Sequence, residues 1–560
     1  MERFLFDFFT PGIAKKAGFI EKIFNGKRVS GEEMSLEEGA PPAAASQENP
    51  LVTGLEYDSR RVMPGDLYFA LPGQHTDGHV FIPKAIRGGA LVIVHQRELS
   101  QYQDGVVYIR VRDSRFAMSP VSHGFYDFPS SRLALIGVTG TEGKSTTVYL
   151  IYQLLCLAGK KAGFISTVQH GDGLMEYANP EHQTTPEATV IHKLLWDMQD
   201  NGAGYAVVEA SSHGLSSRTN RLGDVIFDVG VMTNVTHEHL EFHGSWKQYR
   251  DDKANLFRSL DRDQMGHIKV LKKKDGAGGN SAKPAAVPSF GVVNADDPSA
   301  AYFAAVTKHK TYTYSTRGAD ADLSLRSISS GLLGNWYEVL IRETGEQADI
   351  RDQLPGAFNA GNVLASLLTV SVLLSIPVKK LIPLVTWLKP VRGRMTAIRQ
   401  GQPFDVLVDY AHTPSSFETI FPPLRERADQ GGGRIISLFG SAGERDTKKR
   451  SEQGRIAGEW SDLVILTDED PRGEKPEDIL EEIARGCPGK KREEELFLIP
   501  DRPDAIRKAF SLARPGDLVL LLGKGHENSI IYAFRTKPYD EIREAEKALA
   551  EMGYGEGPAK

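Results

Sequence analysis

Cysteine is nearly absent from this sequence, which has 560 residues and only two cysteines, Cys156 and Cys487. Two thiols are too few for a disulfide framework or for a zinc site built from four thiolates. Such low cysteine usage is typical of a reducing compartment, so we expect a cytoplasmic protein.

Long apolar runs and an excess of positive charge are also lacking. No stretch of about 18 or more apolar residues occurs, so we expect no membrane-spanning helix. The apolar patch at residues 4–9 is interrupted by Asp7 and lacks a nearby cleavage site, which argues against a signal peptide. The net charge is −6, from 67 Lys and Arg against 73 Asp and Glu. This balance excludes a protein that coats nucleic acid and leaves room for local basic pockets.

The chain divides into a leader and three α/β domains. Residues 1–50 form the leader, which we expect to be flexible because residues 30–50 are rich in Glu, Pro and Ala. The apolar patch in it is either an appended segment that packs on the body or frays, or a docking helix for a partner or membrane surface. We place the three domains at residues 51–130, 131–391 and 392–560.

Apolar runs of strand length alternate with helical patterns, which is typical of parallel, doubly wound sheets. Residues 272–289, rich in Lys, Gly and Ala, resemble a low-complexity surface insertion. The predicted strands are 66–71, 90–94, 133–138, 205–208, 229–232, 406–408, 435–439, 463–466 and 518–522.

A glycine-rich turn follows the buried run 133–138 and precedes a helical pattern. Backbone N–H groups in such a turn and the positive helix N-terminus bind phosphates. We expect Lys144 to neutralise the β/γ-phosphates of ATP and Ser145 to bind Mg²⁺. Five residues, rather than the usual four, separate Gly137 from Gly143. The turn reads Gly140-Thr141-Glu142-Gly143-Lys144-Ser145-Thr146.

Three further side chains in the second domain could serve phosphoryl transfer. Glu209 ends a predicted strand, where its carboxylate could face the nucleotide from the neighbouring strand. His239 follows another strand, and a histidine in that position is more often structural than a ligand. Lys253 lies in an acidic helical stretch, where a solvated surface lysine is the ordinary interpretation. None of the three indicates a site alone.

Together, the order of these motifs resembles the Mur ligase family over about residues 52–545. The segments Ser-Ser-His-Gly-Leu and Gly-Lys-Gly-His-Glu resemble most closely the members that add the third residue of the peptidoglycan stem peptide. Besides the glycine-rich turn, the matching motifs are Glu-Ala-Ser-Ser-His-Gly-Leu (209–215), Thr-Asn-Val-Thr-His-Glu-His-Leu-Glu-Phe-His-Gly (233–244), Phe-Asn-Ala-Gly-Asn (358–362), Gly-Arg-Met (393–395), Asp-Tyr-Ala-His-Thr-Pro (409–414) and Gly-Lys-Gly-His-Glu (523–527).

The resemblance implies both a fold and a reaction. The fold would comprise a small N-terminal UDP-binding α/β domain, a central P-loop ATPase-like domain with a parallel sheet, and a C-terminal Rossmann-like α/β domain. The reaction would be the ATP-dependent addition of a diamino acid to UDP-N-acetylmuramoyl-L-Ala-D-Glu in peptidoglycan biosynthesis. Such enzymes activate a carboxylate as an acyl phosphate, which an amine then attacks. We expect a monomer that binds no nucleic acid.

For the ATP site, the resemblance implies catalytic roles for Lys144, Glu209, His239 and Lys253. One Mg²⁺ would be held by Ser145 and Glu209, and a second by His239 and Lys253. Lys253 carries a carbamate in the family, which turns a cation into an oxygen ligand for a hard metal. The implied nucleotide-binding residues are the turn Gly140–Thr146 with Asn294, Arg394 and Asp409. For Asp409 the alternative is a cap at a strand end.

For the muramoyl substrate, the resemblance implies contacts from Ser59 and the loop 74–76 to the UDP portion. The implied peptide contacts are Thr184, Thr185 and Ser211. The family usually has an Arg four residues after the Leu of His-Gly-Leu, but position 219 is Thr. Arg218 and Arg221 flank this position, so either is a candidate for the D-Glu carboxylate.

For the incoming amino acid, the resemblance implies that Arg445, Gly523 and Glu527 hold the α-amino and α-carboxylate region. The distal end would meet Asp470 and Arg472. Members that add meso-diaminopimelate typically show Asp-Asn-Pro-Arg, in which the Arg pairs with the distal carboxylate. Here Asp470 replaces that Asn and Glu469 precedes it. The added negative charge favours a lone distal ammonium, as in lysine or ornithine, whereas the Arg keeps meso-diaminopimelate as the alternative.

Other functions explain fewer of these features. Folylpolyglutamate synthetase shares the ATP core but not the UDP-module resemblance at residues 54–95. The Mur ligase that adds D-Ala-D-Ala shares that module but fits Gly-Lys-Gly-His-Glu less well. A non-catalytic nucleotide-binding relative is disfavoured because Lys144, His239 and Lys253 are all present. A motor-type P-loop ATPase would need no UDP module.

Overall fold

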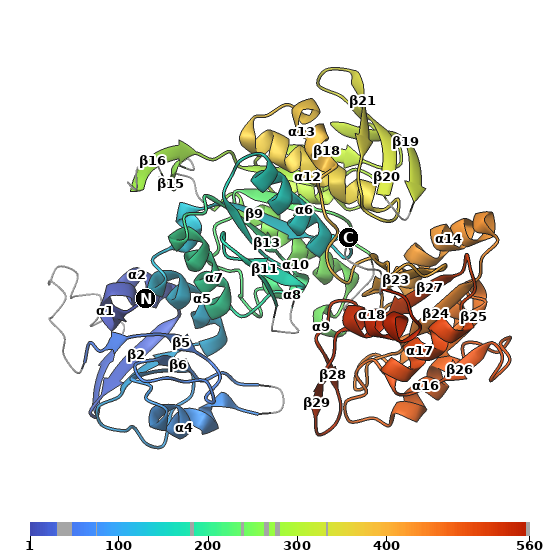
Figure 1. The fold of residues 1–560 in the computed structure, drawn as a ribbon. Coiled ribbons are helices and arrows are strands. Elements are labelled where there is room, and N and C mark those ends of the chain that lie inside the picture. Colours follow the sequence, from blue (N-terminus) through green and yellow to red (C-terminus); the bar gives the residue numbers. More distant parts are fainter. Residues whose placement is uncertain are drawn as a thin grey trace. The chain divides into compact units, whose positions relative to one another are not determined.

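The structure is a computed structural model that describes residues 1–30, 48–73, 76–179, 184–236, 240–262, 268–274, 280–331 and 334–555. The chain forms two compact units (Figure 1). Unit 1 comprises Met1–Arg326, Val339–Ala348 and Gly361–Leu384, and unit 2 comprises Ser327–Glu338, Asp349–Ala360 and Val385–Lys560. The boundary passes through β19 (Leu323–Gly331), β20 (Gly334–Ile341), β21 (Glu346–Arg351), α12 (Asn359–Leu374) and α13 (Val378–Val385).

The first sheet of unit 1 has six strands in the order β3-β2-β8-β7-β6-β5. Its strands are β2 (Phe19–Phe24), β3 (Lys27–Ser30), β5 (Leu55–Glu56), β6 (Leu67–Phe69), β7 (Val92–His95) and β8 (Val107–Val111). The surrounding elements are β1 (Arg3–Phe4), β4 (Leu51–Val52), α1 (Leu5–Phe8), α2 (Pro11–Lys16), α4 (Ile82–Arg87) and α5 (Ser114–Phe125).

The prediction of a flexible leader is wrong for residues 1–30. Strand β2 pairs antiparallel with β8, so the chain start is part of the first sheet. Leu5, Phe8 and Phe9 are buried in its core, and burial of these side chains favours the ordered arrangement. Residues 31–47, most of the remainder of the expected leader, lie outside the described residues.

The second sheet of unit 1 begins in the order β12-β11-β10-β13-β9-β14-β17-β18-β19. From β10 through β18 the neighbouring strands in this order are parallel, as the buried apolar runs predict. The strands are β9 (Ala134–Thr139), β10 (Ala162–Ile165), β11 (Gln169–Gly171), β12 (Glu176–Ala178), β13 (Tyr205–Glu209), β14 (Val229–Met232), β17 (Phe290–Asn294) and β18 (Thr311–Ser315). The helices are α6 (Lys144–Leu157), α7 (Ala188–Asp200), α8 (Ser212–Leu215), α9 (Leu240–His243), α10 (Trp246–Ser259) and α11 (Ala300–Ala305).

The predicted insertion at residues 272–289 overlaps a separate two-stranded sheet. Strand β15 (Ile268–Lys274) pairs antiparallel with β16 (Asn280–Ala286). Across all described residues, no helix has both the length and the apolar character required to cross a membrane.

Unit 2 contains a six-stranded sheet in the order β22-β23-β27-β24-β25-β26, parallel except at β22. The carboxyl ends of parallel strands share one edge, where open α/β sheets bind ligands. The strands are β22 (Thr396–Ile398), β23 (Asp405–Asp409), β24 (Ile435–Phe439), β25 (Leu463–Leu466), β26 (Leu496–Leu498) and β27 (Leu518–Leu522), followed by the hairpin β28 (Ser529–Ile531) and β29 (Thr536–Pro538). The helices are α14 (Pro414–Gly431), α15 (Lys448–Trp460), α16 (Pro476–Ala484), α17 (Arg502–Leu512) and α18 (Glu541–Glu551).

Candidate active site

The glycine-rich turn joins the buried strand β9 to helix α6. Gly140 and Gly143 have φ values of +152° and +80°, which glycine adopts without strain. Lys144 is the first residue of α6, and its Nζ donates to the carbonyl of Thr141 at 2.7 Å. The turn therefore places a cation beside a helix N-terminus, an arrangement that can bind phosphates.

Two asparagines from the family motifs 233–244 and 358–362, to which the sequence assigned no role, support this turn. Oδ1 of Asn234 accepts hydrogen bonds from the N–H groups of Thr141 (3.2 Å) and Glu142 (2.8 Å). Oδ1 of Asn362 accepts from the hydroxyl of Thr147 at 3.1 Å. A Cβ at Gly143 would lie 2.5 Å from the same Asn362 oxygen. The amide of Asn362 therefore packs directly against the turn.

Ser145 and Glu209 lie together where α6 begins and β13 ends. The Ser145 hydroxyl donates to Oε1 of Glu209 at 3.1 Å, and Oε2 accepts the N–H of Thr167 at 2.8 Å. Both side chains are buried. Adjacent oxygen donors beside a phosphate turn fit Mg²⁺, which prefers oxygen ligands together with substrate phosphates. Within the described ranges, no group of three or more His, Cys, Asp and Glu could hold a metal.

Lys253 is buried rather than solvated, being only 1% exposed on α10. Its Nζ donates to the carbonyl of Gly140 at 2.5 Å and lies 4.4 Å from the ring centroid of Tyr249. The surface-lysine interpretation is thus wrong, and Lys253 contacts the glycine-rich turn. His239 lies outside the described residues, so its metal-binding role stays a prediction. Asn294, at the end of β17, donates to the carbonyl of Thr233 at 3.0 Å.

Thr185 and Ser211, predicted to contact the muramoyl peptide, bond to each other. The Thr185 hydroxyl lies 2.9 Å from Ser211 Oγ and donates to the carbonyl of Glu209 at 3.0 Å. Thr184 precedes them in sequence and is half-buried. The structure therefore joins two predicted peptide residues directly to the end of the strand that carries Glu209.

The two candidate arginines differ in how they are held. Arg221 donates to the carbonyl of Thr185 at 2.8 Å and pairs with the buried carboxylate of Glu187 at 2.9 Å. Arg218 is exposed, and its Nη1 donates to the carbonyl of Phe242 at 2.8 Å. Arg221 therefore has a carboxylate partner, which it shares with Arg115, whereas Arg218 has no carboxylate partner among the described residues. This difference supports Arg218 as the residue for the D-Glu carboxylate.

A cavity of about 260 Å³ lies between the first domain and the central sheet. Tyr57, Arg61 and Tyr126 line it from the first domain, and His170 and Asn179 from the central one. Ser59 itself is not among the lining residues but lies two positions after Tyr57. Residues 74 and 75 of the predicted UDP loop lie outside the described residues.

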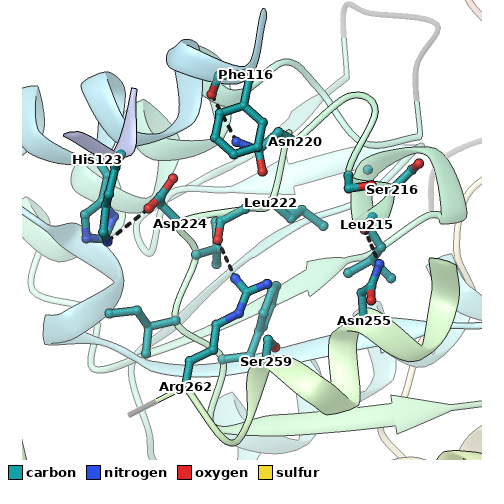
Figure 2. Close-up of a pocket in the computed structure, with 17 residues that line it drawn as sticks. Phe116, His123, Leu215, Ser216, Asn220, Leu222, Asp224, Asn255, Ser259 and Arg262 are labelled. Carbon is teal, nitrogen blue, oxygen red and sulfur yellow. Dashed lines mark hydrogen bonds and ion pairs between the residues drawn. The ribbon is translucent and has the colours of Figure 1, made fainter. Parts of the chain in front are cut away.

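A larger groove of about 760 Å³ contains none of the predicted site residues (Figure 2). It lies among α2, α5, α10 and residues 214–227. Its polar side chains largely bond within the protein, as Figure 2 shows for Asn220 with the carbonyl of Phe116 (3.0 Å). Burial lowers the pKa of His123 to about 4, partly opposed by the charge of Asp224. We therefore assign no ligand to this groove.

In unit 2, Asp409 ends β23 and organises the adjoining loops. Its Oδ2 accepts the N–H of Met395 and its Oδ1 accepts the N–H of Ala411, each at 2.7 Å. Burial raises the pKa of Asp409, while the charge of Arg394 lowers it. Arg394 lies over the ring of Tyr410, 4.7 Å from its centroid. Both carboxylate oxygens are thus occupied by main chain, as the strand-end alternative requires, and a nucleotide role for Asp409 stays a prediction.

The predicted amino-acid residues gather at the same edge of the sheet of unit 2, in the loops after β25 and β27. Lys524, for which the sequence predicted no role, is fully buried and connects them. Its Nζ lies 3.0 Å from Oδ1 of Asp470 and also pairs with Glu527. Gly523 has a φ of +98°, a backbone conformation that favours glycine. Arg445 lies exposed in the loop after β24. The sequence signal for Lys524 was present in Gly-Lys-Gly-His-Glu.

The loop after β25 contains two buried carboxylate oxygens that have no hydrogen-bond partner among the described residues. They are Oδ1 of Asp468 and Oε2 of Glu469. Burial raises the pKa of Asp468 to about 6, although the hydroxyl of Tyr532 donates to it at 3.0 Å. Arg472 has a φ of +53°, and its N–H donates to the carbonyl of Ile531 at 2.9 Å. Its main chain therefore has a structural role independent of the side chain.

Three domain families cover most of the chain. The Mur ligase family catalytic domain matches residues 51–126, the Mur ligase middle domain 138–288 and 281–370, and the Mur ligase glutamate ligase domain 393–525. The chain belongs to the Mur ligase family. The α/β fold with parallel sheets agrees with the three-domain Mur ligase architecture expected from the sequence.

Individual Mur ligases match almost end to end. The chain is 51% identical over 518 residues to the UDP-N-acetylmuramyl-tripeptide synthetase of Treponema denticola, covering 89% of this chain and 94% of that protein. It is 34% identical to the UDP-N-acetylmuramoyl-L-alanyl-D-glutamate--2,6-diaminopimelate ligase of Caldanaerobacter subterraneus subsp. tengcongensis, covering 89% and 95%. A solved structure of a ligase with the latter name has a TM-score of 0.56 at 25% identity, covering 93% of this chain and 98% of that one.

Proposed function

We propose that this Mur ligase adds a diamino acid to UDP-N-acetylmuramoyl-L-Ala-D-Glu in peptidoglycan biosynthesis. ATP is converted to ADP and phosphate in the reaction. The observation that carries the proposal is the 51% identity to a tripeptide synthetase along 94% of that protein. The phosphate-binding geometry at Lys144, Ser145 and Glu209 supports it, because amide synthesis from a carboxylate requires ATP to activate the acid.

The first step forms an acyl phosphate. An oxygen of the D-glutamyl carboxylate attacks the γ-phosphorus, the bond to the β–γ bridging oxygen breaks, and ADP leaves. The N–H groups at the N-terminus of α6 and the Lys144 ammonium hold the phosphates in line and offset the charge that develops on them. Ser145 and Glu209 would hold Mg²⁺, which supplies further positive charge to the phosphates when bound. We also propose the carbamate on Lys253, since the buried Nζ lies at the turn.

The second step forms the amide. The neutral amine attacks the acyl carbon, the carbon–oxygen bond to phosphate breaks, and phosphate and a proton are released. Thr184, Thr185, Ser211 and Arg218 would orient the muramoyl peptide. Arg445 and the loops after β25 and β27 would orient the amino acid. Ser59 and the cavity beside Tyr57 would hold the UDP portion.

We further propose that the amino acid ends in a lone ammonium, as in lysine or ornithine. The loops 468–472 and 523–527 carry four carboxylates, on Asp468, Glu469, Asp470 and Glu527, against the two cations Lys524 and Arg472. Asp470 is paired with Lys524, so Asp470 alone does not supply an unpaired negative charge. The excess of carboxylates over cations in the two loops together makes the region negative. At neutral pH lysine and ornithine carry one net positive charge and meso-diaminopimelate carries none, so the loops attract the former.

The proposal is tested by ligation in a mixture. Purified protein, ATP, Mg²⁺ and UDP-N-acetylmuramoyl-L-Ala-D-Glu are incubated with equal meso-diaminopimelate, L-lysine and L-ornithine, and products are identified by mass spectrometry. We expect one ATP-dependent product, heavier by a lysine or ornithine residue. A diaminopimelate product would overturn the assignment of the amino acid, and no product from folded protein would overturn the ligase function.

Replacing Arg472 by alanine should have a mild effect, within about threefold in kcat/KM for lysine or ornithine. Its N–H to Ile531 is kept in the variant, and a lone ammonium needs no guanidinium partner. Were a distal carboxylate bound there, leaving it unpaired would cost roughly 2 kcal/mol, or about 30-fold. Steady-state kinetics of Arg472→Ala with each amino acid distinguishes the two results.

A further inference from the structure

The two loops that carry the predicted amino-acid residues are joined beneath the surface by Arg502. This residue begins α17 and is fully buried. Its Nη1 donates to the carbonyl of Asp468 at 3.0 Å, and its Nη2 donates to the carbonyl of Leu522 at 2.7 Å. Asp468 begins the loop 468–472, and Leu522 immediately precedes the loop 523–527. One guanidinium therefore ties together the bases of both loops.

A buried carboxylate fixes the orientation of this guanidinium. Nε and Nη2 of Arg502 donate to the two carboxylate oxygens of Glu541 at 2.8 and 2.6 Å. Both side chains are 0% exposed, and the hydroxyl of Tyr539 donates to Glu541 at 2.5 Å. A bidentate pair restricts the rotation of the guanidinium plane. The Arg502 N–H groups that bond to the carbonyls of Asp468 and Leu522 therefore point in fixed directions.

Lys524 makes a second connection, between the outer parts of the same loops. It pairs with Asp470 in one loop and lies three residues before its other partner, Glu527, in its own loop. The loops are thus connected at two levels, through main-chain carbonyls at Arg502 and through carboxylates at Lys524. The Arg502 connection involves no predicted substrate-contacting side chain.

We propose that Arg502 is a positioning residue that sets the spacing between loops 468–472 and 523–527, and thereby selects the length of the diamino acid. The inference rests on the proposed function. A site of fixed dimensions discriminates one methylene by roughly 10- to 200-fold, and ornithine differs from lysine by one methylene. Lysine at position 502 keeps the charge but lacks the planar fork, so it cannot maintain both carbonyl contacts and the bidentate pair.

The test compares Arg502→Lys with Arg507→Lys in the full-length enzyme. Arg507 lies on the same helix and pairs bidentately with Glu551 of α18, at 2.6 and 2.8 Å, but makes no contact with either loop in the described structure. For each protein, kcat/KM is measured with L-lysine, L-ornithine and L-2,4-diaminobutyrate. KM values for ATP and the UDP-muramoyl peptide are measured in parallel.

We expect Arg502→Lys to reduce the preference between the best and second-best amino acid by at least about fivefold, because less fixed loops discriminate a methylene poorly. Its KM for the amino acid should rise, while KM for ATP and the UDP substrate stay within about twofold of wild type. Arg507→Lys should keep the wild-type preference. A folded Arg502→Lys enzyme with unchanged preference would overturn the inference.

Two further results separate this inference from its premises. If Arg502→Lys does not fold, Glu541→Gln carries the test, because it removes the charge that orients Arg502 while keeping a similar shape; unchanged preference in that variant also overturns the inference. Wild-type enzyme that ligates none of the three amino acids would contradict the proposed function itself, whereas an active wild type with length-independent rates would contradict only the role of Arg502.

Discussion

Replacing Lys253 by alanine should lower kcat/KM for ligation by at least about 1,000-fold, or about 4 kcal/mol of transition-state stabilisation. Nζ of Lys253 lies 2.5 Å from the carbonyl of Gly140, within the turn proposed to hold the phosphates. The variant removes both the buried amine and the carbamate proposed on it. Product formation by mass spectrometry measures the loss, and circular dichroism confirms that the fold is kept.

Companion variants identify which property of Lys253 matters. Lys253→Arg keeps a positive charge but cannot form the lysine carbamate, so it should be as inactive as Lys253→Ala. Lys247→Ala, an exposed position on the same helix, should retain full activity. Short-chain carboxylates should partly restore Lys253→Ala. In wild-type protein, ¹³C-labelled bicarbonate should give a carbamate NMR signal that is lost in Lys253→Ala. Full activity of Lys253→Arg would exclude the carbamate.

The glycine-rich turn between a strand and a helix was predictable because all its parts are contiguous. A buried apolar run, a glycine-rich turn and a helical pattern lie within about 25 residues, and the structure places them as β9, the turn and α6. Asn234 and Asn362 lie in motifs that match the family, but the contacts of their amides with the turn were not predictable. The two amides reach the turn from 92 and 215 residues away from their partners Glu142 and Thr147, and a single sequence contains no sign of such contacts.

The chain start shows how composition misled the prediction. Glu, Pro and Ala enrichment in residues 30–50 suggested flexibility, which we extended to the whole leader. Yet residues 1–30 contain the apolar side chains that pack beneath the first sheet, and β2 pairs with β8 some 90 residues later. The apolar patch was visible in the sequence. Its partner strand was not, because antiparallel pairing between distant segments leaves no local periodicity.

Charges at the amino-acid loops were predictable, but their pairing was not. The sequence displays Asp470 as an additional negative charge, whereas in the structure it pairs with the buried Lys524. In the sequence, Arg502 is an ordinary residue at the start of a helix. Only the fold shows that its side chain bonds to the carbonyls of Asp468 and Leu522. The sequence thus supplied candidates for substrate contact, but not the residues that hold those candidates in place.

Replacing Gly143 by alanine should raise KM for ATP by at least about 100-fold, equivalent to about 2.7 kcal/mol. Two independent penalties apply. The φ of +80° costs an alanine roughly 1–2 kcal/mol, and its Cβ would lie 2.5 Å from Oδ1 of Asn362, which is held by Thr147. The turn must therefore move, and its N–H groups lose their alignment with the phosphates. ATP titration and steady-state kinetics measure the effect.

Gly159→Ala separates backbone strain from displacement of the turn. Gly159 follows the same helix α6, has a φ of +75°, and a Cβ there would meet no atom within 4 Å. This variant should lose roughly 1–2 kcal/mol of stability with KM for ATP unchanged, because it pays the same conformational cost away from the phosphates. If Gly143→Ala lowered stability equally but bound ATP normally, the close approach of Asn362 would have no part in nucleotide binding. The double variant Gly143→Ala/Asn362→Ala should recover part of the affinity for ATP that Gly143→Ala loses, because the clash is removed while the backbone strain remains.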